Sequence, residues 1–256
     1  MPKRILSEIW IYPVKSLGGI RLSSAEVREK GLRFDRRWML IDEEGKFLTQ
    51  RALPQMALFK LAKSDHAFEI SFGKDSLELP LDIPSSGKER PAVIWRDNVS
   101  VCEAPEHFHR WFSDRLGFPC RLVTFPESNP RPVDSAYRLA NENVSLADGY
   151  PILVIGQSSL DDLNTRLAQP VPMNRFRPNL VFTGGLPYEE DNWRNFRVGQ
   201  NALLGVKTCG RCVLTTVDQA TGVMGREPLL TLSRYRKKDD RICFGQNVIP
   251  VDLNEI

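Results

Sequence analysis

The stretch Cys209-Gly210-Arg211-Cys212-Val213-Leu214-Thr215-Thr216-Val217-Asp218 is the most informative part of this 256-residue chain. Its Cys-x-x-Cys spacing invites a zinc site, but a structural zinc needs four ligands, and no second cysteine pair or suitably spaced histidine accompanies it. A thioredoxin-type dithiol opens a helix, whereas we expect a β-branched strand over 213–217. Two interpretations stay open: thiolates beside Arg211 that bind a soft metal or hold a persulfide, or two idle thiols.

A second cluster lies near the N-terminus, at Tyr12-Pro13-Val14-Lys15-Ser16-Leu17-Gly18-Gly19. A predicted strand ends here at a proline, and Lys15 and Ser16 then enter a turn that contains glycine. An ammonium, a hydroxyl and backbone N–H groups that converge in such a turn suit a phosphate. The alternative is a surface turn with a solvated lysine, because short motifs often occur without function.

Two arginine clusters also precede predicted strands. In Phe34-Asp35-Arg36-Arg37-Trp38, adjacent arginines either grip a phosphate or pair with the neighbouring aspartate. In Asn174-Arg175-Phe176-Arg177-Pro178-Asn179-Leu180, the proline forbids helix, and alternate arginines would point the same way before an apolar strand. This cluster forms either an anion site or a salt-bridged strand entry.

Composition places the chain among ordinary soluble proteins. It carries 41% hydrophobic and 26% charged residues and a net charge of +3, and no Lys/Arg run is long enough to demand nucleic acid or anionic lipid. The first residues lack the apolar segment of a signal peptide, and no apolar run approaches the ~20 residues of a membrane span. The five cysteines are sparse and odd in number. We therefore expect a cytoplasmic protein in a reducing setting, with no nucleic-acid or membrane partner.

The hydrophobic pattern predicts a mainly β protein with a few helices (α+β). Residues 1–104 alternate in short runs typical of a sandwich or barrel, with a hairpin turn at Glu44-Gly45. The predicted strands of this half are 5–12, 20–27, 38–41, 47–49, 58–62, 68–72, 92–95 and 99–102.

The second half mixes helices and strands. A helix is expected from Pro105 to Gly117, followed by a linker over 126–134. A second helix, capped by Ser158-Ser159 with Asp161-Asp162, should bury Leu160, Leu163 and Leu167. The further predicted strands are 151–155, 180–182, 202–206, 213–217 and 247–253.

Together and in this order, the four clusters resemble the MOSC proteins, nearest to the branch that contains the mitochondrial amidoxime-reducing component and its bacterial relatives. The tail Thr221-Gly222-Val223-Met224 adds to the likeness, which covers nearly the whole chain. The resemblance implies an N-terminal MOSC β-barrel-like domain over residues 1–120 and a MOSC β-barrel domain over residues 121–256.

The resemblance also implies a molybdenum cofactor, a pterin dithiolene that holds the metal. Cys212 would be the protein ligand to the metal, and Asp148 would lie near it as the second catalytic residue, positioning or relaying a proton. Where animal members have Ser and Tyr, this chain has Gly210 and Asn247. The cofactor-binding residues that the resemblance implies are Lys15, Ser16, Arg36, Gly149, Tyr150, Arg177, Asn179, Gly210, Arg211, Cys212 and Asn247.

The implied reaction is a molybdenum-dependent two-electron reduction of N-hydroxylated substrates, such as hydroxylamines, amidoximes and N-oxides, in which the cofactor does the redox work. The cysteines outside the motif do not form an iron–sulfur site of recognised spacing, and the chain ends at Ile256 without a ferredoxin domain. A separate electron donor, a ferredoxin- or flavin-type reductase, is therefore expected. The alternative is a carrier that passes on persulfide sulfur or the cofactor itself, and pyridoxal phosphate binding stays open at the family level.

Overall fold

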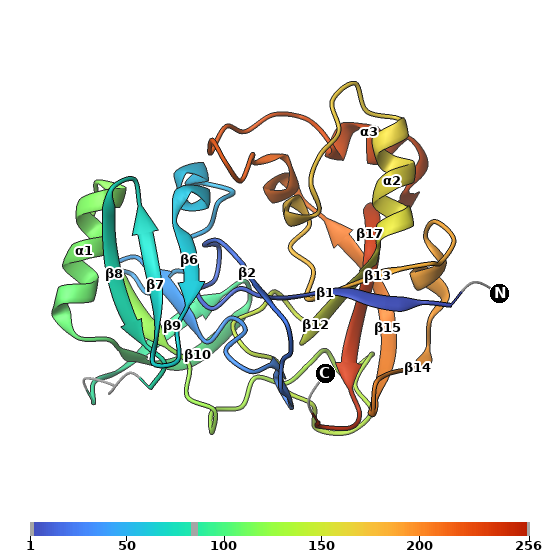
Figure 1. The fold of residues 1–256 in the computed structure, drawn as a ribbon. Helices are drawn as coiled ribbons and strands as arrows, with labels where there is room; N and C mark the ends of the chain where they lie inside the picture. The colour runs from blue at the N-terminus through green and yellow to red at the C-terminus, as the bar shows by residue number, and fades with distance from the viewer. Residues whose placement is uncertain (1–2, 83–86, 255–256) are drawn as a thin grey trace.

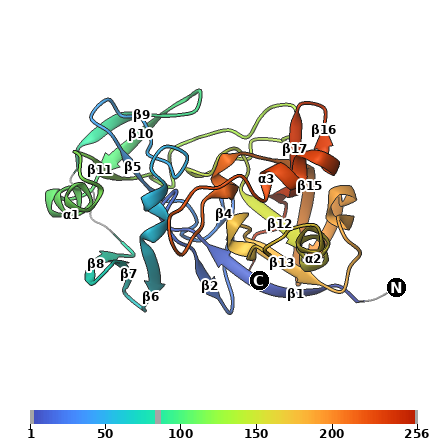
Figure 2. The ribbon, with the colours of Figure 1, turned by 90° about the horizontal axis from the view of Figure 1, so that it is seen from above.

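The computed structural model describes residues 3–82 and 87–254, and β-strands dominate them. Figures 1 and 2 show the molecule elongated, with α1 and the smaller sheets on one side and α2, α3 and a large sheet on the other. The described residues form three α-helices and seventeen strands, which confirms a mainly β fold with a few helices.

The large sheet combines strands from both ends of the chain. Its path begins at β14 and ends at β2, and only the β12–β13 pair is parallel. Parallel neighbours need a crossover, which here contains α2 (Gln157–Thr165). In order along the path, the strands are β14 (Asn195–Val198), β15 (Asn201–Arg211), β17 (Arg241–Pro250), β12 (Ile152–Gly156), β13 (Leu180–Thr183), β1 (Ile5–Ile11) and β2 (Ile20–Leu22), with β16 (Lys237–Lys238) paired to β17.

The first two strands thus join the sheet of the second half, with Ile9 opposite Leu180. The segment that follows β1 therefore carries the Lys15–Ser16 turn to the edge of that sheet. The division at residues 120 and 121 stays a prediction.

Three smaller sheets complete the fold, two of them on the side of α1. A four-stranded sheet runs β5 (Trp38–Ile41), β11 (Arg121–Thr124), β10 (Asp97–Glu103) and β9 (Glu89–Ile94). A three-stranded sheet is formed by β6 (Lys60–Lys63), β7 (Ala67–Phe72) and β8 (Asp75–Pro80), and a short hairpin by β3 (Val27–Arg28) and β4 (Gly31–Leu32).

The helix predicted after Pro105 is confirmed as α1 (Glu106–Leu116), and Gly117 ends it in the left-handed region at φ +80°. The predicted helix that buries Leu160, Leu163 and Leu167 is confirmed as α2. Its expected Ser158-Ser159 cap is wrong.

The N-cap of α2 is Gly156, whose N–H donates to the buried Glu190 carboxylate at 3.1 Å. The Ser159 hydroxyl donates to the same carboxylate at 2.8 Å, so a distant residue supplies the acceptor expected from the local sequence.

Other local predictions also need correction. The expected strand over 213–217 is a 3-10 helix, η4 (Val213–Thr216), and the region from 54 to 58 is η1 (Pro54–Leu58), with β6 beginning only at Lys60. Residues 47–49 make only isolated bridges, at Phe47 with Ile41 and nearby at Lys46 with Val93. The sequence prediction missed β4, β8, β11, β14, β16, α3 (Leu229–Tyr235) and the short helices η2 (Met173–Arg175) and η3 (Glu189–Asn192).

One hydrophobic core spans both sides of the molecule. Ile9, Trp38, Phe112, Leu180 and Val248 belong to a single cluster of buried side chains, although they come from the large sheet, the four-stranded sheet and α1. Such a shared core fixes the two sides against each other. Within residues 3–82 and 87–254, no helix has the length and apolar character of a membrane span.

Candidate functional site

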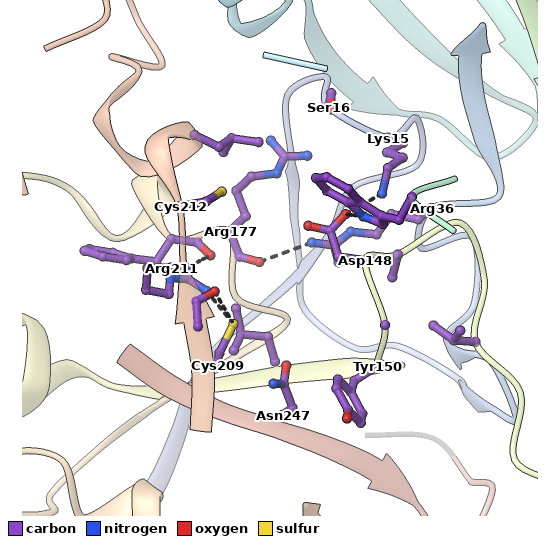
Figure 3. A pocket seen from close by; sticks show the side chains of 18 of the residues that line it. Lys15, Ser16, Arg36, Asp148, Tyr150, Arg177, Cys209, Arg211, Cys212 and Asn247 are labelled. Atoms are coloured by element: carbon purple, nitrogen blue, oxygen red, sulfur yellow. Dashed lines mark hydrogen bonds and ion pairs between the residues drawn. The ribbon is translucent and has the colours of Figure 1, made fainter. Parts of the chain in front are cut away.

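A cavity of about 810 Å³ lies where the loops of the two sides meet. Figure 3 shows Cys209, Arg211 and Cys212 on one wall, and Lys15 and Asp148 on the facing one. All twelve residues that the sequence singled out as catalytic or cofactor-binding line this cavity, namely Lys15, Ser16, Arg36, Asp148, Gly149, Tyr150, Arg177, Asn179, Gly210, Arg211, Cys212 and Asn247.

The cavity carries a strong excess of positive charge. Its ten cationic side chains are opposed by the three aspartates Asp97, Asp134 and Asp148. A concave surface with this balance concentrates anions, and phosphate groups above all. The cations are Lys15, Arg36, Arg51, Arg96, Arg131, Arg175, Arg177, Lys207, Arg211 and Arg241.

Asp148 is the centre of an ion-pair network on one wall. Its Oδ1 accepts from Lys15 Nζ at 2.6 Å and from Trp95 Nε1 at 3.3 Å, and its Oδ2 accepts from Arg51 Nη2 at 3.0 Å. Desolvation in the cavity opposes the charged form, although 56% of the Asp148 side chain is exposed, and the charges of Lys15 and Arg51 outweigh it and hold the pKa of Asp148 well below its usual range. A carboxylate held in this way is suited to positioning its neighbours.

Lys15 is the buried partner in this network, with 5% of its surface exposed. Its Nζ also donates to the Leu146 carbonyl at 2.8 Å. Burial lowers the pKa of Lys15 to about 8, although the charge of Asp148 acts to raise it. The next residue, Ser16, adopts φ +67°, and its carbonyl accepts from Gln50 Nε2 at 2.7 Å. The turn predicted from the sequence is therefore buried and rigidly held.

The two cysteines of the motif have different partners. Cys212 precedes η4, and its Sγ accepts from Arg51 Nε at 3.1 Å. Cys209 lies on β15, and its Sγ accepts from Arg211 Nη1 at 2.9 Å. The strand expected after Cys212 is absent, so that argument against a thioredoxin-type dithiol was wrong, but a four-residue 3-10 helix is not the long α-helix such a motif opens either.

Arg36 and Arg177 stack on the buried ring of Tyr12. Their guanidinium carbons lie 4.4 and 4.1 Å from its centroid. Arg36 also donates to the Asp35 carboxylate at 2.6 Å. Arg177 is 8% exposed and has φ +56°, and its Nη2 is buried without a hydrogen-bond partner in the described part of the chain. Burial lowers the pKa of Arg177 to about 10. A buried guanidinium with an unused donor at a cavity wall is suited to an anionic ligand.

Asn179 has its side chain committed within the protein. Its Oδ1 accepts from the Leu153 N–H at 3.1 Å and from Arg36 Nη1 at 3.2 Å, and its Nδ2 donates to the Trp10 carbonyl at 3.1 Å. It is 1% exposed. Asn179 therefore holds three segments and Arg36 in place, and its amide has little left for a ligand.

The remaining sequence-predicted residues also line the cavity, and the two glycines among them leave free space in it. A Cβ on Gly149 would meet nothing within 4 Å, and one on Gly210 would touch only the Arg241 side chain, at 3.4 Å. The Tyr150 hydroxyl is buried with no partner among the described residues. Asn247 lies on β17, opposite Leu153 of β12.

Sequence patterns did not identify Arg51, Trp95, Arg131 or Lys207 as site residues. Arg131 donates to the carbonyls of Ser145, Ala147 and Asp148, and so fixes the backbone that carries Asp148. None of these four residues lies in a sequence motif, and only the fold brings them to the cavity. Among the described residues, no three His, Cys, Asp or Glu side chains gather as metal ligands, so a zinc site is not supported.

Family models identify the class of protein. The MOSC N-terminal beta barrel domain matches residues 3–119, and the MOSC domain matches residues 141–253. The chain belongs to the MOSC family.

Curated relatives make the assignment more specific. The chain is 37% identical over 255 residues to mitochondrial amidoxime-reducing component 1 of Mus musculus, with 94% of this chain and 74% of that protein covered. It is 36% identical to the Homo sapiens protein of the same name, with 94% and 75% covered. Molybdenum cofactor sulfurase of Oryza sativa subsp. japonica is 32% identical over 261 residues, which span 94% of this chain and 32% of that protein.

These relatives and the MOSC domain associate the chain with the molybdenum cofactor. The cavity fits that group on its own chemistry. It offers the Cys212 thiol as a soft metal ligand, and at its wall lie the buried donors Arg177 Nη2 and Arg211 Nε, which have no partner among the described residues. The names of these three relatives do not refer to pyridoxal phosphate, so they give no support to that association.

Proposed function

We propose that the protein holds the molybdenum cofactor in this cavity and reduces N-hydroxylated compounds with electrons from a separate donor. The observation that carries the proposal is the position of Cys212, whose thiol lines a cavity with ten cationic side chains. The names of the amidoxime-reducing relatives support the choice of reaction. The substrate class is hydroxylamines, amidoximes and N-oxides.

In this proposal the reaction consumes two electrons and two protons. The N–O bond of the substrate breaks, the nitrogen keeps its carbon substituents, and the oxygen leaves as water. The bound cofactor supplies the two-electron redox chemistry, with Cys212 as its protein ligand. Lys15, Arg36 and Arg177 bind its phosphate, because they are cations that face the cavity.

Asp148 has a positioning role in this scheme. Its carboxylate fixes the Lys15 ammonium at 2.6 Å and the Arg51 guanidinium at 3.0 Å. Because the pKa of Asp148 is held well below its usual range, this residue is a weak proton acceptor at neutral pH. We therefore favour positioning over proton relay, the other role considered for it.

The first experiment is elemental analysis for molybdenum with fluorescent detection of extracted pterin, on protein made in a host that synthesises the cofactor. Molybdenum and pterin near one per chain support the proposal. Cys212→Ser should abolish molybdenum retention and reduction of benzamidoxime, while Cys209→Ser, the matched control in the same motif, should keep both. Wild-type protein without molybdenum would refute the proposal.

A second experiment tests the electron donor. NADPH alone should give no turnover with the purified protein, and addition of a ferredoxin- or flavin-type reductase should restore it. Turnover with NADPH alone would contradict a separate donor. We also propose a cytoplasmic location, in keeping with the five free cysteines, which fractionation of the native cell tests.

The similarity to molybdenum cofactor sulfurase favours one rival function, a carrier of persulfide sulfur or of the cofactor. In that case Cys212 carries the transferred sulfur. Mass spectrometry of the intact protein separates the two: a persulfide on Cys212 without molybdenum favours the carrier, and molybdenum without added sulfur favours the reductase.

A further inference from the structure

Arg51 is a cation of the cavity that no sequence motif contains, and its guanidinium is held on several sides. Its Nη1 donates to Thr49 Oγ1 at 3.2 Å, and its Nη2 donates to Asp148 Oδ2 at 3.0 Å. Its guanidinium carbon lies 4.4 Å from the centroid of the Trp95 ring. These contacts fix the plane of the guanidinium, because each nitrogen of the fork has its own direction.

The remaining nitrogen of that fork points to sulfur. Arg51 Nε donates to Cys212 Sγ at 3.1 Å, and among the described residues it is the one side chain recorded as a donor to this sulfur. Cys209 takes its hydrogen bond from Arg211. The two thiols of the motif therefore accept hydrogen bonds from different arginines. Arg211 is local to the motif, and Arg51 comes from the other side of the molecule.

The backbone next to Arg51 is tied to both halves of the site. Gln50 is fully buried and donates to the Ser16 carbonyl at 2.7 Å. Gln219, which follows η4, donates to Gln50 Oε1 at 2.8 Å. The residue before Arg51 thus connects the Lys15–Ser16 turn to the segment after Cys212. This network holds the Arg51 guanidinium in a fixed position relative to the Cys212 sulfur.

We infer that Arg51 is a positioning residue for the Cys212 sulfur, which it orients and whose donor strength it lowers through the Nε–H···Sγ hydrogen bond. This inference rests on the proposed role of Cys212 as metal ligand. A hydrogen bond to a metal-bound thiolate withdraws electron density from the sulfur, and such contacts govern metal affinity and reduction potential. Loss of the bond makes the sulfur a stronger donor, so the potential of the metal falls.

The test compares Arg51→Gln, Arg51→Lys and Thr49→Val with wild-type holoenzyme. Arg241→Gln is the charge-matched control, because Arg241 lines the same cavity but is recorded as a donor to neither sulfur within the described ranges. The readouts are molybdenum and pterin per chain after dialysis, and the molybdenum reduction potential from a mediated redox titration.

We expect Arg51→Gln to weaken molybdenum retention about 10- to 100-fold, because loss of the orientation of the sulfur outweighs its greater donor strength; losses of this size are typical when the outer contact of a ligand is removed. The molybdenum reduction potential should fall further in Arg51→Gln than in Arg241→Gln. Arg51→Lys should restore the potential only in part, because an ammonium keeps the charge without the fork. Thr49→Val, which removes the acceptor of Arg51 Nη1 and of the Arg51 backbone N–H but keeps the bond to sulfur, should shift the potential in the same direction by less.

Equal potentials in Arg51→Gln and Arg241→Gln, or an unchanged potential in the Arg51 variants, overturn the inference. If Arg51→Gln does not fold, Thr49→Val decides, and an unchanged potential in that variant overturns the inference as well. Wild-type protein that loads no molybdenum refutes the proposed function and this inference together. Wild-type protein that loads molybdenum while the Arg51 variants behave like the control refutes the inference alone.

Discussion

Lys15 Nζ lies 2.6 Å from Asp148 Oδ1, although 133 residues separate the two in the chain. The pair joins the turn after β1 to the segment before β12, and it forms one wall of the cavity. Both side chains keep their charge at neutral pH, because the pKa of Lys15 is about 8 and that of Asp148 is held low.

Anion binding should depend on the protonation of Lys15. Its pKa is about 8, so the ammonium is present below that pH and is lost above it. We expect the affinity of metal-free protein for pyrophosphate to fall as the pH rises through about 8. In Asp148→Asn the midpoint should move to lower pH, because the charge that raises the pKa of Lys15 is gone. Isothermal titration calorimetry between pH 6 and pH 10 measures both.

Lys15→Arg is the control for that measurement, since an arginine keeps its charge as the pH rises through about 8. An affinity that falls equally in Lys15→Arg would assign the pH dependence to another group.

Arg177→Met should stabilise the metal-free protein while weakening cofactor binding. The Arg177 Nη2 is buried without a partner in the described part of the chain, and such a group costs roughly 1–3 kcal/mol. Methionine has no polar atom to bury. Thermal unfolding should show a higher Tm, and pterin analysis a lower cofactor content. Arg36→Met is the comparison: it should lower the Tm, because Arg36 is bonded to Asp35 and Asn179. A lower Tm in Arg177→Met would contradict this account.

Asn179→Ala should act through stability more than through direct loss of a ligand contact. Its amide bonds to the backbone of Trp10 and Leu153, and removal leaves buried groups unsatisfied at a cost of roughly 1–3 kcal/mol. Urea unfolding should show this loss. Asn247 lines the cavity, and Asn247→Ala should keep the free energy of unfolding within about 0.5 kcal/mol of the wild-type value. Equal free energies of unfolding in Asn179→Ala and Asn247→Ala would contradict a structural role for Asn179.

Two glycines of β15 should respond differently to the same change. A Cβ on Gly210 would meet only the flexible Arg241 side chain at 3.4 Å, whereas a Cβ on Gly205 would lie 2.1 Å from the Trp193 carbonyl oxygen. Gly210→Ser should therefore keep the wild-type Tm and cofactor content, while Gly205→Ser should lower the Tm by several degrees. Differential scanning calorimetry compares them, and a large loss in Gly210→Ser would show that the cofactor loop requires glycine.

Local sequence determined those features whose causes are local. Glycine after a run with helical spacing ended α1 at Gly117, and the apolar alternation located most of the strands. Residues at the ends of predicted strands, such as Lys15, Arg177 and Cys212, also meet in one cavity. Their order along the chain was sufficient for the family resemblance, which the MOSC models confirm.

Tertiary structure decided what depends on partners far away in the chain. The β-branched run after Cys212 predicted a strand, but it is a 3-10 helix whose Thr215 hydroxyl bonds back to the Cys212 carbonyl. The acceptor for the Gly156 N–H at the start of α2 comes from Glu190, 34 residues further along the chain. Arg51 is unremarkable in sequence, and only the packing of both sides on one core brings its guanidinium to Cys212. Hydrogen bonds between distant residues leave no periodic trace in a sequence, because periodicity records only which face of an element is buried.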